Sequence, residues 1–153
     1  MDTLIIRPYR PEDWPRAAAI HDAARQEELR HAGLEAAFLP LEVAAQREGL
    51  FDHTVVVAEE AGAVRGFAAW TEAELSWLYV DPAAARRGIG RALVRRFLVE
   101  HPGRPLSVEV LAGNAPALAL YQSLGFRVSE TLTGSMPGNE SFPVTVHVLE
   151  LRP

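Results

Sequence analysis

The segment spanning residues 74–111 constrains the fold most, because it reads as a strand, a helix and another strand in succession. ELSWLYV (74–80) and LSVEVL (106–111) are short apolar runs bounded by turn residues. The apolar residues between them recur at the spacing of one helix face, namely Ile89, Leu93 and Phe97, with Ala92 and Val99 beside them. Two strands joined by a crossover helix run parallel. We therefore expect a parallel pair of strands inside the sheet.

The other segments add strands on both sides of this pair. Strands are expected at residues 3–9, 54–60, 64–72, 126–133 and 142–151. Helices are expected at residues 12–30, 40–49 and 115–125. The order is β α α β β β α β α β β, with meanders on both sides of the parallel pair. No repeat or linker interrupts it, so residues 1–153 are expected to form one domain with a mixed α/β sheet.

Composition excludes several classes of protein. The chain is 48% hydrophobic, but it has no apolar run of membrane-spanning length and no signal peptide, so we expect a soluble, cytoplasmic protein. The net charge of −5 argues against a nucleic-acid binder. Without cysteine there is no disulfide, thiolate nucleophile or cysteine-based zinc site. The five histidines lack metal-ligand spacing, so no metal is expected.

The basic residues carry a further constraint. All fifteen are arginine, which excludes a lysine nucleophile and a P-loop. Three of them, Arg86, Arg87 and Arg91, surround the start of the helix at Gly88, where sequences usually place acidic or capping residues. Glycines expose the backbone amides of such a turn to a ligand, and the helix dipole favours an anion. The turn therefore predicts a phosphate site flanked by arginines.

The turn is also open to two other interpretations. Arg87, Arg91 and Arg95 are four residues apart, as on a solvated helix face. A dinucleotide fingerprint is disfavoured, because Leu93 occupies the position of the third small residue and seven residues separate Val80 from Gly88.

A second group of residues lies in GNAPALALYQSLGF (113–126). Asn114 suits a helix N-cap, Pro116 suits the first turn, and Gly125 suits the C-terminal cap. Asn114 and Tyr121 are seven residues apart, hence close to one face of the helix. The simpler interpretation is a cap and a core tyrosine.

Together, LSWLYVDP, RRGIGRALV and the pattern N-x-P-A-x-x-x-Y-x-x-x-G-F resemble the GNAT superfamily of acetyl-CoA-dependent N-acetyltransferases. The resemblance is strong from Val64 to Phe126. It implies a mixed, mostly antiparallel seven-stranded sheet with a splayed central parallel pair and helices on both faces. The family usually places a basic residue where this chain has Ala85, so Arg86 and Arg87 are expected to replace it.

The resemblance also implies a binding site for acetyl-CoA as co-substrate. Pantetheine would pair with the strand at residues 78–80, pyrophosphate would bind the amides of residues 87–92, and Asn114 would contact the pantetheine arm or hold the splay. The residues so assigned are Leu78, Tyr79, Val80, Arg86, Arg87, Gly88, Ile89, Gly90, Arg91, Ala92 and Asn114.

Attack of an amine on a thioester requires a neutral amine and protonation of the leaving thiolate. Tyr121 is the predicted acid, since a phenol stays protonated at neutral pH. Glu74 is the predicted base, because related histone acetyltransferases carry a glutamate six residues before the position of Val80; strand alternation would place it with Ser76, Leu78 and Val80. Glu72, Glu109 or a water molecule are alternatives. The absence of cysteine and lysine favours direct transfer in a ternary complex.

The acceptor is expected to be a primary amine of a small molecule or peptide. In this family it is bound by the segments at residues 30–40 and 134–143. Acidic residues in and near them favour a cationic amine, although solvated surface acids are equally consistent: Glu27, Glu28, Glu35 and Glu140. A non-catalytic acyl-CoA sensor or docking module is the alternative function, and a binder of another phosphorylated ligand a fainter one. Whether the chain forms a homodimer stays open.

Overall fold

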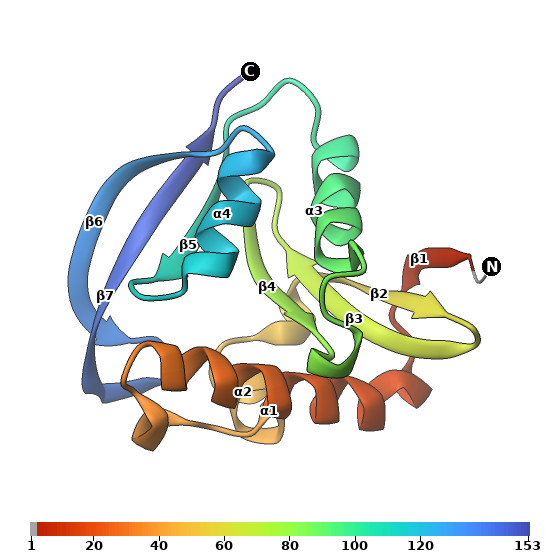
Figure 1. Ribbon diagram of the computed structural model, residues 1–153, viewed down its shortest axis with the longest axis horizontal. Coiled ribbons are helices and arrows are strands. Elements are labelled where there is room, and N and C mark those ends of the chain that lie inside the picture. The colour runs from red at the N-terminus through yellow and green to blue at the C-terminus, as the bar shows by residue number, and fades with distance from the viewer. Residues whose placement is uncertain (1–2) are drawn as a thin grey trace.

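The computed structural model describes residues 3–153, which form a seven-stranded sheet in the order β1-β2-β3-β4-β5-β7-β6 (Figure 1). The strands are β1 (Leu4–Pro8), β2 (Thr54–Glu60), β3 (Ala63–Trp70), β4 (Glu74–Val80), β5 (Leu106–Leu111), β6 (Arg127–Met136) and β7 (Asn139–Leu151). The helices are α1 (Trp14–His31), α2 (Leu41–Arg47), α3 (Ile89–Glu100) and α4 (Ala115–Ser123), with single 3-10 turns between some elements. Only β4 and β5 pair in parallel, which confirms the predicted mixed sheet with a central parallel pair.

The parallel pair separates soon after it begins. Only Glu74 with Ser107 and Leu75 with Val108 are in register across it. Beyond them β5 stays paired with β7 through Leu111, whereas β4 stays paired with β3, so the two central strands diverge (Figure 1). The predicted splay is therefore present, and it opens the middle of the sheet.

A β-bulge interrupts β4 just before the divergence. Leu75 lies opposite Trp70 and Trp77 lies opposite Ala69, which leaves Ser76 as an extra residue. A bulge of this kind shifts the alternation of side chains by one residue. Leu75 therefore packs on the face covered by α3, whereas Trp77 packs on the face covered by α1 and α2.

The bulge also changes the position of Glu74. Because Glu74 precedes Leu75, its side chain lies on the α1 and α2 face with Trp77. Leu78 packs on the opposite face. The expectation that Glu74 shares a face with Leu78 and Val80 is wrong, since simple alternation does not hold across an inserted residue.

Each face of the sheet carries its own core. On one face α3 and α4 cover a core that includes Leu93, Phe97 and Phe126. On the other face α1 and α2 cover a core that includes Ile20 and Phe67. The predicted helices thus cover both faces and bury the faces that the periodicity indicated.

One residue of the predicted stripe on α3 lies elsewhere. Val99 is 74% exposed, and Val94 is buried instead. Val99 lies about 120° around the helix from the middle of the stripe formed by Ile89, Leu93 and Phe97. It also belongs to the last turn of α3 before the helix ends at Glu100, so no element covers it.

The two closing strands are longer than expected. β6 continues to Met136 and β7 begins at Asn139, so most of the predicted loop at residues 134–143 is a hairpin. Thr133 and Thr145 face each other with their hydroxyls 3.2 Å apart, and Gly138 has a φ of 76° in the tight turn. Polar strand residues concealed this hairpin in the sequence.

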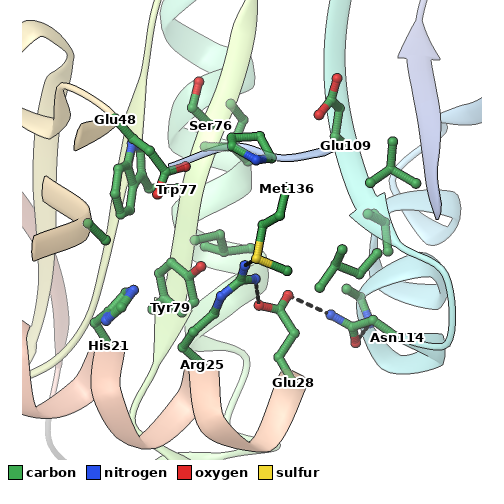
Figure 2. A pocket seen from close by; sticks show the side chains of 18 of the residues that line it. His21, Arg25, Glu28, Glu48, Ser76, Trp77, Tyr79, Glu109, Asn114 and Met136 are labelled. Carbon is green, nitrogen blue, oxygen red and sulfur yellow. Dashed lines mark hydrogen bonds and ion pairs between the residues drawn. The ribbon is translucent and has the colours of Figure 1, made fainter. Parts of the chain in front are cut away.

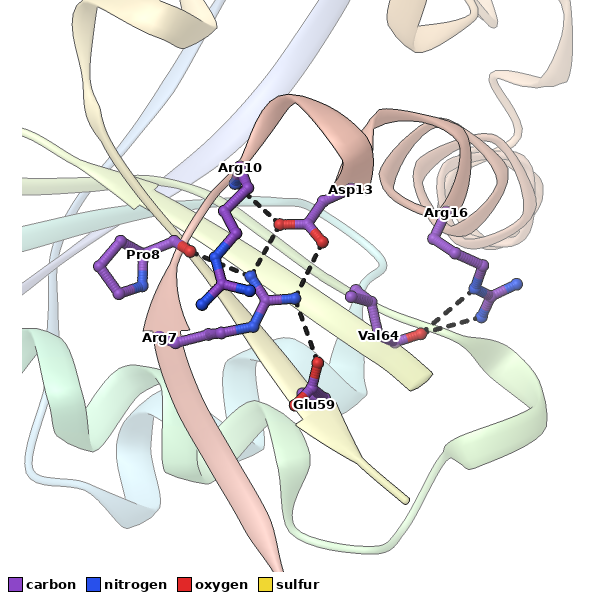
Figure 3. A network of polar contacts seen from close by, with 7 residues as sticks. All are labelled: Arg7, Pro8, Arg10, Asp13, Arg16, Glu59 and Val64. Carbon is purple, nitrogen blue, oxygen red and sulfur yellow. Dashed lines mark hydrogen bonds and ion pairs between the residues drawn. The ribbon is translucent and has the colours of Figure 1, made fainter. Parts of the chain in front are cut away.

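A buried ion-pair network joins β1 to the start of α1 (Figure 3). The guanidinium of Arg7 donates to both carboxylate oxygens of Asp13 at 2.9 Å and to Glu59 at 3.2 Å. Asp13 also accepts from the amide of Arg10 at 2.8 Å. Hydrogen bonding to Arg7 is the main reason that the pKa of Asp13 lies below its ordinary value. The network therefore fixes where α1 starts relative to the sheet.

Replacing Asp13 by asparagine should lower the free energy of unfolding at pH 7 by about 3 kcal/mol, because a buried guanidinium loses its main partner. The lowered pKa means that this stabilisation is complete above the ordinary carboxylate pKa of about 4 and is lost as pH falls below it. Denaturant unfolding measures the free energy of unfolding of both proteins. The difference between variant and wild type should be large at pH 7 and small near pH 3.

The matched control is Glu100→Gln, which removes an exposed ion pair with Arg96 at 3.2 Å. It should cost under about 0.5 kcal/mol. A similar loss in both variants would contradict the structural role assigned to Asp13.

Candidate active site

Two cavities meet where β4 and β5 diverge. The first, here called the turn cavity, has a volume of about 470 Å³ and is lined by the end of β4, the turn before α3 and the start of α4. The second, here called the split cavity, has a volume of about 200 Å³ and is lined by α1, α2, β4, β5 and the β6–β7 turn (Figure 2). Five residues line both, namely Glu28, Leu78, Tyr79, Asn114 and Ala117. Molecules bound in the two cavities would therefore be neighbours.

The turn before α3 presents unpaired backbone donors to the turn cavity. Gly88 is the N-cap and has a φ of 80°, and Arg86 also has a positive φ of 65°. The amide of Ala92 donates to the carbonyl of Gly88 at 3.0 Å, whereas the amides of residues 86–91 have no acceptor within the described part of the chain. A side chain at Gly88 would meet no atom within 4 Å, so a ligand has room there. This is the geometry of an anion site.

The arginines of this turn point in different directions. Arg86 and Arg91 line the turn cavity, and Arg91 also donates to the hydroxyl of Ser123 at 2.9 Å. Arg87 instead forms an ion pair with Glu60 at 3.0 Å and does not line the cavity. Two residues assigned to the coenzyme A site, Arg87 and Ala92, do not line the turn cavity. Arg87 is paired with Glu60 on the β2–β3 hairpin, and the amide of Ala92 is hydrogen-bonded within the helix.

The strand side of the turn cavity comes from β4. Leu78, Tyr79 and Val80 all line it, as does Ile89 together with Gly88 and Gly90 of the turn. Beyond Leu75, β4 has no ladder partner in β5. This edge of β4 therefore lies inside the sheet and carries backbone groups that a ligand can reach.

Asn114 joins α4 to α1 beside the opening. Its side-chain oxygen accepts from the amide of Ala117 at 3.3 Å, which caps α4. Its side-chain nitrogen donates to Glu28 at 3.0 Å, and Glu28 also accepts from Arg25 (Figure 2). Asn114 thus has the predicted capping role and also holds the two sides of the splay together.

Tyr121 of α4 lines the split cavity. Its side chain is buried and packs edge-on against Phe126, with ring centroids 5.8 Å apart. Burial raises the pKa of Tyr121, and the charge of Glu28 raises it further. The phenol therefore stays protonated at neutral pH and is a hydrogen-bond donor.

Of the carboxylates considered as bases in the sequence, Glu109 of β5 lines the split cavity, together with Glu28 and Glu48, whereas Glu74 does not line it. Glu74 lies in an adjoining cavity, where it accepts a hydrogen bond from the hydroxyl of Ser76 at 3.0 Å and shares the lining with Glu109. Partial loss of water raises the pKa of Glu109, and the negative charge of Glu74 adds to this effect. The third alternative, Glu72, projects into solvent with its side chain 94% exposed.

Sequence reasoning missed His21, which also lines the split cavity. Its ring is 2% exposed, its Nδ1–H donates to Asp22 at 2.9 Å, and it stands edge-on to Tyr79 at 4.8 Å. Burial lowers the pKa of His21, so the ring is neutral at neutral pH. The spacing of the histidines in the sequence bears only on metal binding, and nothing in the local sequence signals that His21 faces a cavity.

The acidic residues expected near the acceptor are divided. Glu28 lines both cavities, Glu27 lines the turn cavity, and Glu35 and Glu140 line neither. Glu48 of the segment after α2 lines the split cavity and was not predicted. Among residues 3–153, no three His, Asp or Glu side chains gather closely enough to hold a metal ion. No helix in this part of the chain is long and apolar enough to cross a membrane.

The GNAT acetyltransferase domain model matches residues 51–128, which is about half of the chain and includes β4, the glycine turn and α4. This chain belongs to the GNAT acetyltransferase family.

Curated relatives of this GNAT acetyltransferase are similar over shorter stretches. A peptidyl-lysine N-acetyltransferase of Escherichia coli K12 is 41% identical over 73 residues, which is 47% of this chain and 49% of that protein. The ribosomal protein bS18-alanine N-acetyltransferase of the same organism is 47% identical over 58 residues, which is 36% of this chain and 39% of that protein. The chain thus spans about half or less of the length of these relatives.

A solved structure of similar fold contains a ligand. The acetyltransferase yncA of Salmonella typhimurium, determined with its cofactor acetyl-CoA, has a TM-score of 0.68 and 22% identity. The match covers 97% of this chain and 93% of that one. At this identity the likeness shows the fold, which here extends over the whole described chain.

Replacing Arg86 by alanine should weaken coenzyme A binding about tenfold, because a charge-assisted contact to phosphate is lost. The matched control is Arg87→Ala, which should change the affinity by roughly twofold or less, since Arg87 is occupied by Glu60. Calorimetric titration with coenzyme A and with pantetheine separates phosphate contacts from other effects. Equal losses in the two variants, or for the two ligands, would contradict the assignment.

Proposed function

We propose that the protein transfers an acetyl group from acetyl-CoA directly to a primary amine, with acetyl-CoA in the turn cavity and the amine in the split cavity. The observation that carries this proposal is that the two cavities share five lining residues at the opening between β4 and β5. The described chain offers both cavities on one sheet, so we also propose that residues 1–153 act as a single domain.

The turn cavity has groups that suit two polar parts of acetyl-CoA, the pyrophosphate and the amide groups of pantetheine. The unpaired amides of residues 86–91 would bind the pyrophosphate, with Arg86 and Arg91 beside it. The free edge of β4 at Leu78 to Val80 would accept the amide groups of pantetheine as an additional strand. The Salmonella protein of the same fold was determined with acetyl-CoA, which supports acetyl-CoA as the ligand.

The chemistry requires two proton transfers, and the split cavity contains a group for each. A protonated acceptor first releases one proton to solvent; the neutral nitrogen then bonds to the carbonyl carbon and gives a second proton to Glu109, directly or through water. The carbon–sulfur bond then breaks, and Tyr121 gives its proton to the departing sulfur. We prefer Glu109 to Glu74 because Glu109 faces the cavity and its pKa is raised. Glu74 would act on the reaction through Glu109.

Direct transfer is the simpler route for this chain. An acyl-enzyme intermediate needs a nucleophile, and the chain contains neither cysteine nor lysine. The shared residues between the two cavities allow the reacting groups to approach each other without such an intermediate.

The acceptor is proposed to be a protonated amine of a peptide or protein. Glu28, Glu48 and Glu109 line the split cavity against a single arginine, Arg25, which is itself paired with Glu28. This excess of negative charge favours a cationic acceptor. The relatives named for acting on peptidyl-lysine and on the alanine of a ribosomal protein support a peptide amine.

Thiol release tests the function. Incubation with acetyl-CoA, a panel of peptide amines and a colorimetric thiol reagent should yield free coenzyme A only when an acceptor is present. A sensor or docking module would bind acetyl-CoA without releasing thiol with any amine.

Tyr121→Phe should lower kcat by roughly 10² to 10⁴, since the general acid is removed while the ring remains. The affinity for acetyl-CoA should change little. Steady-state kinetics measures kcat, and a melting curve measures whether the variant remains folded. If the variant kept full turnover per folded molecule, Tyr121 would have only a packing role.

The pH dependence distinguishes the two carboxylates. Glu109→Gln should lower kcat/KM roughly 10²-fold or more. Glu74→Gln should remain active, and the acid limb of its pH profile should move to lower pH, because loss of the charge of Glu74 lowers the pKa of Glu109. A given acceptor amine ionises in the same way in every assay. Differences between the pH profiles of wild type and variants therefore come from groups of the enzyme. The assignment of Glu109 as the base would be contradicted if the acid limb of the pH profile did not move in Glu74→Gln, or if Glu109→Gln kept full activity.

A further inference from the structure

A third cavity, here called the aromatic groove, lies on the side of α2 away from the split cavity. Its volume is about 700 Å³, and three aromatic residues line it, namely Tyr9 after β1, Trp14 at the start of α1 and Phe51 in the turn after α2. The ring centroids of Tyr9 and Phe51 are 5.2 Å apart, and those of Trp14 and Phe51 are 6.1 Å apart. Phe51 is 54% exposed, so this cluster is open to solvent.

The charged side chains that line the aromatic groove are all acidic. Glu42 of α2 and Asp52 of the turn after it supply carboxylates, and no arginine or histidine lines the groove. Nearby Arg47 donates to the carbonyl of Gly138 instead. Burial raises the pKa of Tyr9, and the charges of Asp13 and Glu12 add to the effect, so its ring is neutral. Aromatic faces and carboxylates together attract an organic cation.

We propose that the aromatic groove binds an arginine or lysine side chain of a partner protein. The stem of such a side chain would lie on Phe51, and its charged head would meet Glu42 and Asp52. A small anion or an apolar peptide lacks this complementarity. The site is separate from the acetyl-transfer machinery, because none of its lining residues lines the turn cavity or the split cavity.

The position of the groove favours a protein as the source of the cation. Ala44 and Glu48 line the split cavity, whereas Glu42 and Ala45 line the groove, so α2 stands between the two. A helix of seven residues is about 10 Å long, which is well within the footprint of one partner protein. The choice of a protein as the source of the cation rests on the proposed function, whereas binding at the groove is measurable without acetyl transfer.

Fluorescence anisotropy with a peptide that contains no amine tests the proposal. The probe is Gly-Arg-Gly-Arg-Gly with fluorescein on its amino terminus and an amide at its carboxyl terminus, compared with the same peptide carrying glutamine for arginine. The wild-type protein should bind the arginine peptide and not the glutamine peptide. Phe51→Ser and Asp52→Asn should each weaken binding about tenfold, because each removes one half of the cation site.

Two control variants locate the binding. Val99→Ser removes an exposed apolar side chain of α3 and should leave the affinity unchanged. Glu109→Gln alters the split cavity and should also leave it unchanged. Phe51→Ser and Asp52→Asn change exposed side chains, so both variants should remain folded, which melting curves check. The proposal is overturned if the two peptides bind equally, if neither binds, or if Glu109→Gln weakens binding while the groove variants do not.

Discussion

The divergence of β4 and β5 is the constraint on which the rest of the structure depends. Two strands in the middle of a sheet normally satisfy each other's backbone groups, and separating them leaves donors and acceptors without ladder partners. Here β3 holds β4 and β7 holds β5, so each strand keeps one paired side while the sheet opens between them. The opening is bridged from α1 to α4 by the hydrogen bond between Glu28 and Asn114. A free strand edge within the sheet and two adjoining cavities follow from this one arrangement.

The bulge at Ser76 determines which side chains reach the opening. It turns Trp77 and Tyr79 toward α1 and leaves Leu78 on the α3 face, so side chains from both faces of one strand reach the opening. It also places Glu74 on the same face as Glu109, so that the charge of Glu74 adds to the main effect of desolvation in raising the pKa of Glu109. A local irregularity of the backbone thereby adjusts the proton affinity of a group on the neighbouring strand.

The sequence was sufficient for those features whose cause is local. Strands β4 and β5 and the start of α3 lie where their apolar periods and glycines indicated. The features that it could not predict depend on distant residues. Arg87 is drawn away from the turn cavity by Glu60, which is 27 residues earlier. Ser76 shows no sign of being an extra residue, so alternation placed Glu74 on the wrong face. Glu109 could be preferred over Glu74 only after both strands were seen around the same opening.

The unusual arginines at the start of α3 fit the same arrangement. A helix N-terminus repels cations, so Arg86 and Arg91 are unfavourable for the helix alone. They line a cavity whose unpaired amides carry positive partial charge, whereas carboxylates predominate in the adjoining split cavity. Glu27 and Glu28 of α1 also line the turn cavity, so its positive groups are gathered at the turn before α3, and the net charge of −5 reveals nothing of this distribution. The opened sheet therefore brings the cationic groups of the α3 turn and the carboxylates of α1 and β5 into two adjoining cavities.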